Sequence, residues 1–110
     1  MDEPFPEAEC QLMAEFFVLF ANRTRLRMFC ALQSGPKTVS ELAEYAGISL
    51  QNASQHLRLM RDKGALTTKK DGQRVFYTVI DPRFIEAARM MRDALIEAMQ
   101  RKAGTVGSTG

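Results

Sequence analysis

The chain has 110 residues, of which 45% are hydrophobic and 25% charged, and a net charge of +2. This length predicts one domain with a modest core, and no apolar run approaches the ~18–20 residues that a membrane span requires. The acidic start MDEPFPEAEC lacks the basic segment of a secretory signal or transit peptide, and two cysteines suit a reducing compartment better than a disulfide scaffold. We therefore expect a cytoplasmic protein.

Charge is distributed unevenly along the chain. Residues 1–20 carry five acidic side chains and no basic one, whereas residues 51–80 carry six basic and two acidic side chains. This asymmetry indicates that one surface meets a negatively charged partner and another avoids it, although solvated faces alone would produce similar runs.

Two helices are predicted before residue 36. The first is expected over 7–21, where apolar residues recur at helical spacing. This stripe comprises Leu12, Met13, Phe16, Phe17 and Phe20. Asn22 is a candidate N-cap for the second helix, which is expected to continue until Ser34-Gly35-Pro36 ends it.

A helix-turn-helix unit comes next. Thr38 and Glu41 in TVSE have the spacing of a capping box, which predicts a short helix ending at Gly47. Ser49 is a candidate N-cap for a helix over 50–63, which packs through its apolar positions and ends at Gly64. These positions are Ala53, Leu57 and Met60. Two short helices separated by GIS form the unit.

A β-hairpin is predicted after Gly64. ALTTKK and QRVFYTVI alternate with a period of two and flank Asp71-Gly72, a dipeptide typical of two-residue hairpin turns. Asp81-Pro82 then opens a long helix over 83–102 with one apolar stripe. That stripe comprises Phe84, Ala88, Met91, Leu95 and Met99. Residues 103–110 show no periodicity and are expected to form a disordered tail.

The helix over 50–63 has a polar face directed away from its packed side. We call this the polar face; it comprises Gln51, Asn52, Ser54, Gln55 and Arg58. No acidic residue occurs from Ile48 to Arg61, although an ordinary solvated helix would carry Glu as well as Lys. Because Asn and Gln side chains bond adenine in the major groove and a helix N-terminus approaches phosphate, the polar face predicts DNA binding.

Cationic and polar residues also gather at the tip of the predicted hairpin, where they would reach the DNA backbone or minor groove. We call this group the hairpin tip; it comprises Lys69, Lys70, Gln73 and Arg74. The alternative for the hairpin tip alone is that these side chains only keep the hairpin soluble. The remaining candidate DNA contacts are Thr38, Ser49 and His56, the last in either a packing or a phosphate-contact role. Arg23, Arg25 and Arg27 are assigned surface or phosphate roles.

Three stretches carry a resemblance to a known family. LFANRTRLRMFCAL, TVSELAEYAGISLQNASQHLRLMRDKGAL and KKDGQRVFYTV together resemble the ArsR/SmtB family of bacterial winged-helix repressors, over about residues 15–80. The resemblance implies a mostly α fold with a small hairpin, in the order α-α-α-α-β-β-α. It also implies that residues 1–102 form a winged helix DNA-binding domain with dimerisation helices at both ends.

Members of this family are typically homodimers joined through their first and last helices, and an inducer releases them from operator DNA. The resemblance therefore implies a homodimeric repressor that binds double-stranded DNA. Two-fold symmetry would place the two helices carrying polar faces roughly 34 Å apart, over an inverted repeat.

The metal sites of the family do not match this sequence. Where metal-sensing members carry two thiols, this chain has Thr38 and Ser40, and hydroxyls are poor ligands for soft metals. The last helix contains acidic residues, and no histidine follows His56. Those residues are Asp81, Glu86, Asp93 and Glu97, and solvated helix charge explains them better than a metal site. No metal or cofactor is expected.

Cysteine chemistry is the remaining candidate for an inducer response. Cys30 occupies the place of a reactive cysteine in thiol-sensing members of the family, but their second cysteine, on the last helix, is missing here. Cys10 is a substitute if the first two helices run antiparallel, since both sulfurs would then lie about 14–16 Å from the turn at Ala21. A bridge requires Cα atoms within ~7 Å, and the alternative is two independent buried thiols.

The leading hypothesis is thus a sequence-specific repressor, with a switch through Cys10 and Cys30 as an additional hypothesis. The alternative is a winged-helix protein-interaction module that does not bind DNA. An enzyme is not expected, because one histidine and no glycine-rich phosphate loop leave little with which to build a catalytic site.

Overall fold

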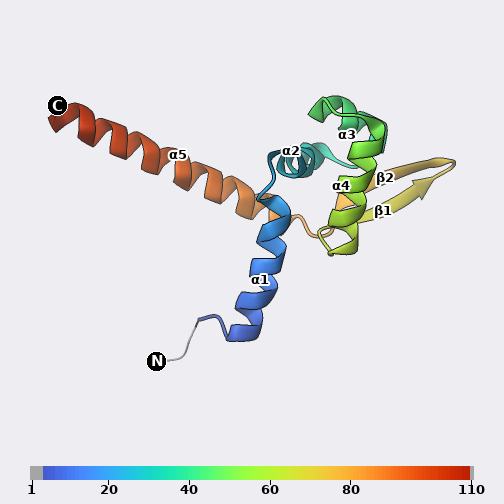
Figure 1. Ribbon diagram of the computed structural model, residues 1–110, viewed down its shortest axis with the longest axis horizontal. Helices are drawn as coiled ribbons and strands as arrows, with labels where there is room; N and C mark the ends of the chain where they lie inside the picture. The colour runs from blue at the N-terminus through green and yellow to red at the C-terminus, as the bar shows by residue number, and fades with distance from the viewer. Residues whose placement is uncertain (1–3, 110) are drawn as a thin grey trace. The chain divides into compact units, whose positions relative to one another are not determined.

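The computed structural model describes residues 4–109, with side chains described from residue 4 to residue 104. Asp2 and Glu3 of the acidic start therefore lie outside the described residues. The elements are α1 (Glu7–Phe20), α2 (Arg23–Ala31), the 3₁₀ helix η1 (Leu32–Ser34), α3 (Val39–Ala46), α4 (Leu50–Asp62), β1 (Leu66–Asp71), β2 (Arg74–Val79) and α5 (Arg83–Thr109) (Figure 1). This order confirms the predicted winged helix-turn-helix topology.

The chain divides into two compact units, the first ending at Ile80 and the second beginning at Asp81. The sequence predicts a single domain over 1–102, and that boundary stays a prediction. The unit that ends at Ile80 contains the helix-turn-helix and the hairpin, and the unit that begins at Asp81 contains α5.

Local capping explains where α2 begins and ends. The side chain of Asn22 accepts a hydrogen bond from the amide of Arg25 at 3.0 Å, as the sequence predicts for an N-cap. The predicted helix continues to Ser34, but α2 ends at Ala31 and its last turn tightens into η1. Such 3₁₀ turns satisfy carbonyls at a helix end, and Gly35, with φ of 125°, then turns the chain away.

The helix-turn-helix geometry follows from the ends of α3. The Thr38 hydroxyl accepts from the amide of Glu41 while the Glu41 carboxylate accepts from the amide of Thr38, which completes the predicted capping box. At the other end, Gly47 is left-handed and the amide of Ile48 donates to the carbonyl of Ala43 at 3.1 Å, a Schellman ending. The chain therefore turns within three residues and enters α4.

The hairpin turn lies one residue later than the sequence predicts. Asp71 pairs with Arg74, so the two turn residues are Gly72 and Gln73 rather than Asp71 and Gly72. Gly72 has φ of +65°, and no non-glycine residue in the described chain has positive φ. Positive φ at the first turn position alone is typical of a type II′ turn, which explains why the glycine occupies that position.

The core of the unit that ends at Ile80 lies between the helices and the hairpin. Its largest fully buried side chains are Met28, Leu42, Leu57, Met60 and Leu66. A short backbone bridge ties the segment before α3 to β2, because Lys37 and Tyr77 exchange amide-to-carbonyl hydrogen bonds of 3.0 and 2.7 Å. The bridge and the core fix α3, α4 and the hairpin with respect to one another.

Helix α1 packs much less than the other helices of its unit. Every residue from 4 to 15 is exposed, and Leu19 is the buried residue of this helix. Leu12 and Phe17 of the predicted apolar stripe are 67% and 48% exposed, and Phe16 and Phe20 are half-buried. Much of this stripe is therefore uncovered within the unit that ends at Ile80.

Helix α5 begins beside Asp81, whose carboxylate accepts from the amide of Arg83 at 2.9 Å. Its apolar residues Met90, Leu95 and Met99 are each more than 60% exposed. The helix continues to Thr109, beyond the end predicted at 102, so residues 103–109 are helical where the sequence predicts a disordered tail; Gly110 lies outside the described residues. The stretch 103–109 contains glycines, which weaken a helix, but no proline to stop it. Within the described chain, no helix is both long and apolar enough for a membrane span.

Candidate nucleic-acid interface

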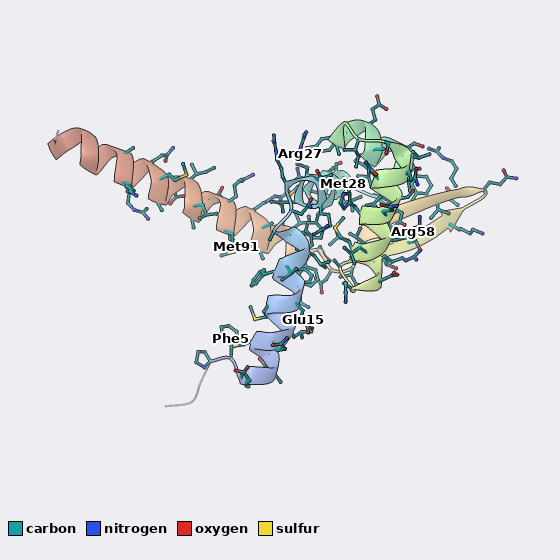
Figure 2. All side chains as sticks on the ribbon, viewed as in Figure 1. Phe5, Glu15, Arg27, Met28, Arg58 and Met91 are labelled. Atoms are coloured by element: carbon teal, nitrogen blue, oxygen red, sulfur yellow. The ribbon has the colours of Figure 1, made fainter. Side chains whose placement is uncertain are left out.

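Four of the five residues of the polar face are exposed on α4. They are Gln51, Asn52, Gln55 and Arg58, while Ser54 is half-buried. The opposite side of α4 is anchored by Ala53, Leu57 and Met60, each without measurable exposure. Because residues three or four apart share a helix face, burying that stripe directs the polar face outward. Figure 2 shows Arg58 on α4 and Met28 inside the unit.

The predicted contacts Thr38 and Ser49 both act as helix caps. Ser49 accepts from the amide of Asn52 at 3.1 Å, and its hydroxyl hydrogen is available for a further acceptor. The Thr38 hydroxyl accepts from Glu41 and also donates to the Glu41 carboxylate at 3.0 Å. The Thr38 hydroxyl is thus engaged on both sides, and a DNA contact by Thr38 remains a prediction.

The capping box also affects the titration of Glu41. The amide and hydroxyl of Thr38 donate to the Glu41 carboxylate and lower the pKa of Glu41. Hydrogen bonds to the charged form of a carboxyl stabilise that form. The N-terminus of α3 therefore retains its carboxylate cap at neutral pH.

The residues of the hairpin tip are all exposed. Lys69 pairs with Phe76, and Arg74 pairs with Asp71, so Lys69 and Arg74 lie on one face of the two-stranded sheet. Lys70 pairs with Val75 and lies on the other face. The Arg74 guanidinium lies 5.2 Å from the centre of the Phe76 ring. Such stacking limits the freedom of a long side chain, so Phe76 orients Arg74. This role was not predicted from the sequence, although the two residues are two positions apart on one strand.

His56 lies at the edge of the polar face of α4, one helical turn from Asn52. It is half-buried, and its Nδ1 lies 3.4 Å from Nη1 of Arg25 on α2. Burial, followed by the charge of Arg25, lowers the pKa of His56. This position favours the packing role over the phosphate-contact role that the sequence left open.

Arg25 does not lie on the open surface, where a surface or phosphate role was expected. It is half-buried, and its Nε donates to the carbonyl of Leu19 in the last turn of α1 at 2.7 Å. Arg27, by contrast, is exposed and lies 5.1 Å from the ring centre of Tyr45. The sequence offered no sign of the contact between Arg25 and His56, because the two residues are 31 positions apart.

The two cysteines differ in exposure. Cys10 is exposed on α1, where its Sγ lies 3.5 Å from the carbonyl of Phe5, and Cys30 is half-buried on α2. Close antiparallel packing of α1 on α2 would cover one face of α1, yet residues 4–15 are exposed throughout. The exposure of α1 therefore gives no support to the antiparallel arrangement on which the sequence-based bridge depends.

No group of three or more His, Cys, Asp or Glu side chains lies close enough to hold a metal ion among the residues that the structure describes.

Comparison with known proteins identifies relatives of this chain. A family model described as a helix-turn-helix domain matches residues 20–69, from the end of α1 into β1. A probable mercury resistance operon repressor from Streptomyces lividans is 35% identical over 79 residues, which are 72% of this chain and 63% of that protein. A transcriptional repressor SmtB homolog from Synechocystis is 31% identical over 90 residues, which are 82% of this chain and 68% of that protein.

Among solved structures, a homodimeric winged helix-turn-helix DNA-binding domain from Mycobacterium bovis, described as a possible ArsR-family transcriptional regulator, matches with a TM-score of 0.74. The match covers 88% of this chain and 93% of that chain at 22% identity, so it bears on the fold. This chain spans less than two thirds of the length of the Streptomyces repressor.

Proposed function

The chain belongs to the ArsR/SmtB family of winged helix-turn-helix transcriptional regulators, and we propose that it is a homodimeric repressor that binds an inverted-repeat operator in double-stranded DNA. The observation that carries this proposal is the exposed polar face of α4, free of acidic residues, in the same compact unit as the exposed cations of the hairpin tip. In this proposal α4 contacts base edges and the hairpin contacts the backbone or minor groove.

The roles of the candidate residues follow from chemistry and exposure. Gln51, Asn52 and Gln55 carry amides that both donate and accept, as adenine recognition requires, and Arg58 is suited to guanine or phosphate. Lys69, Lys70, Gln73 and Arg74 supply affinity that falls with salt, because they would displace counterions from phosphate. Ser49 would contact phosphate at the N-terminus of α4. We leave His56 out of the DNA contacts, because it is half-buried against Arg25.

The dimer proposal is supported by uncovered apolar surface. Leu12 and Phe17 of the stripe on α1 are 67% and 48% exposed, and Leu95 and Met99 of the stripe on α5 are 66% and 71% exposed. Apolar residues concentrated on one element at such exposure are typical of an interaction surface. The Mycobacterium bovis relative of this fold is itself described as homodimeric. We infer that α1 and α5 supply the interface between two copies.

The proposed DNA contacts are tested by selecting a duplex from a random library with the wild-type chain and comparing it with a scrambled duplex. Gln55→Ala should weaken binding to the selected duplex by about 1–3 kcal/mol while changing the scrambled duplex little. Lys70→Ala should weaken both duplexes similarly and reduce the salt dependence. Gln100→Ala, on α5, is the matched amide control and should change neither.

Two outcomes would contradict this function. Equal losses on both duplexes with Gln55→Ala would remove the assignment of α4 to base contacts. A chain that binds neither duplex would favour the alternative of a winged-helix module that contacts proteins rather than DNA. No enzymatic activity forms part of the proposal, and the cytoplasm is the compartment in which a bacterial regulator would meet its operator.

A thiol-linked release from DNA, through Cys10 and Cys30, forms the second part of the proposal. The Streptomyces relative is named for mercury resistance, and thiolates are the side-chain groups that bind soft metals best. Since residues 4–15 are exposed, a link that includes Cys10 would need either movement of α1 or the helix of a second copy. Binding of the selected duplex should be lost after polysulfide, arsenite or mercuric ion, and retained with Cys10→Ser or Cys30→Ser. Equal responses of wild type and both variants would contradict the thiol switch.

A further inference from the structure

Arg25, on α2, contacts two further helices. Its backbone amide donates to the Asn22 side chain at the start of α2, and its side-chain Nε donates to the carbonyl of Leu19 in the last turn of α1. Its Nη1 lies 3.4 Å from Nδ1 of His56 on α4. Since the last turn of α1 contains no basic residue of its own, the guanidinium also supplies the positive charge that a helix C-terminus favours. The guanidinium is therefore held by α1 while it contacts α4.

The chemistry of this contact specifies the state of His56. A guanidinium has five N–H donors and no acceptor, so Nδ1 of His56 must supply a lone pair. The imidazole is then neutral and carries its proton on Nε2. Protonation would convert Nδ1 into a donor and would place two positive charges beside each other.

The surroundings of His56 favour the neutral form at neutral pH. Burial lowers the pKa of His56, and the charge of Arg25 lowers it further. Among the described residues, α3 and β1 also pack against α4, but no charged side chain from either contributes to this pKa shift. His56 is the one histidine of the 110 residues, so no other side chain has an ordinary pKa between pH 5.5 and 7.5.

We propose that Arg25 is a positioning residue that holds α4 through His56, and that protonation of His56 releases α4 and lowers discrimination between DNA sequences. The contact lies at the boundary between the packed side of α4 and the polar face, one helical turn from Asn52. Loss of the contact therefore changes the orientation of the polar face without removing a DNA-contacting side chain. The effect on DNA rests on the proposed function, whereas the release of α4 does not.

The contact itself is tested in the full chain without DNA, by NMR titration of the ¹⁵N-labelled imidazole. We expect the Nε2–H form at pH 7.5 and a pKa below about 6.5. Arg25→Gln should raise that pKa. Arg27→Gln removes the same charge from an exposed position on α2 and should leave it unchanged. Equal pKa values in wild type and Arg25→Gln would overturn the pairing.

The release of α4 is tested on the same samples through the backbone amides of residues 50–52. In the wild type these signals should shift together with the imidazole titration, and in His56→Gln they should stay constant. Amides that do not respond to the titration in the wild type would overturn the release, whether or not the chain binds DNA.

The effect on DNA is measured as the ratio of affinities for the selected and scrambled duplexes at pH 7.5 and 5.5. In the wild type this ratio should fall about fivefold on acidification. In His56→Gln it should stay constant, because the amide oxygen of glutamine accepts from Arg25 at either pH. In Arg25→Gln it should be low at both values.

A His56→Gln chain with the wild-type pH dependence would overturn the positioning role. A wild-type chain that does not discriminate between the duplexes at pH 7.5 would instead contradict the proposed function, and the amide titration would still decide the release of α4.

Discussion

Helices α4 and α1 both carry an apolar stripe, but the unit that contains them covers these stripes to very different extents. On α4, Ala53, Leu57 and Met60 show no measurable exposure, whereas on α1 Leu12 and Phe17 are 67% and 48% exposed. The first stripe contributes to the stability of the unit that contains it. The second would stabilise the protein only when another surface covers it. Similar periodicity in sequence therefore corresponds to folding in one case and, under the dimer proposal, to association in the other.

The largest expected effect concerns the covered stripe. Leu57→Ala removes a fully buried side chain and leaves a cavity, so we expect the free energy of unfolding to fall by about 3 kcal/mol. Leu12→Ala, the same change at an exposed position of α1, should alter the unfolding free energy of the unpaired chain by less than about 0.5 kcal/mol. Urea unfolding at low protein concentration measures both. Similar losses would remove the distinction between the two helices.

The uncovered stripe should matter for association instead. Leu12→Asp places a charge on the stripe, and we expect it to weaken the proposed dimer by about 2 kcal/mol while the helical content is retained. Ala14→Asp, at an exposed position on the opposite side of α1, carries the same charge and should leave the dimer intact. Analytical ultracentrifugation distinguishes the two variants. A Leu12→Asp chain that dimerises as the wild type does would exclude α1 from the interface.

A smaller effect on stability is expected at the junction between α1 and α2. Asn22→Ala removes the side-chain cap of α2 and should lower the unfolding free energy by about 1 kcal/mol. Ser40→Ala, at an exposed hydroxyl residue inside α3, should change it by less than about 0.5 kcal/mol. Thermal unfolding of the two variants side by side measures the difference. Equal changes in unfolding free energy would show that the hydrogen bond of the Asn22 cap does not stabilise α2.

The smallest effect is a pH dependence at the capping box. Donors from Thr38 lower the pKa of Glu41 in the folded chain. The stabilisation is therefore present above the ordinary glutamate pKa, near ~4.3, and is lost as the pH falls through the lowered folded value. Glu41→Gln should show a smaller loss of stability on acidification from pH 6 to 3 than the wild type. Glu44→Gln, on the same helix outside the capping box, should follow the wild type.

The local structure of the chain was largely predictable because its determinants lie within a few residues. The caps at Asn22, Thr38 and Ser49 all have the predicted hydrogen bonds. The errors were local too. The hairpin turn moved by one residue because pairing of Asp71 with Arg74 left Gly72 for the position that needs positive φ.

The features that sequence reasoning missed depend on contacts between distant segments. Nothing near Arg25 indicates that its guanidinium contacts a histidine 31 residues away, since that contact depends on how α1, α2 and α4 pack. The pairing considered for Cys10 and Cys30 assumed an antiparallel α1 and α2, an orientation that helical periodicity does not specify. The polar face of α4 was predictable because burial of one stripe determines the direction of the opposite side.

The uncovered stripe of α1 also has a consequence for how abundance would regulate such a protein. Under the dimer proposal, each copy that the cell synthesises shifts the balance from isolated chains toward pairs by mass action. At low concentration, unpaired chains would keep the apolar side chains of α1 exposed to water, where proteases and chaperones act on them. Intracellular concentration would then determine both how long the protein survives and how much of it is competent to occupy its operator.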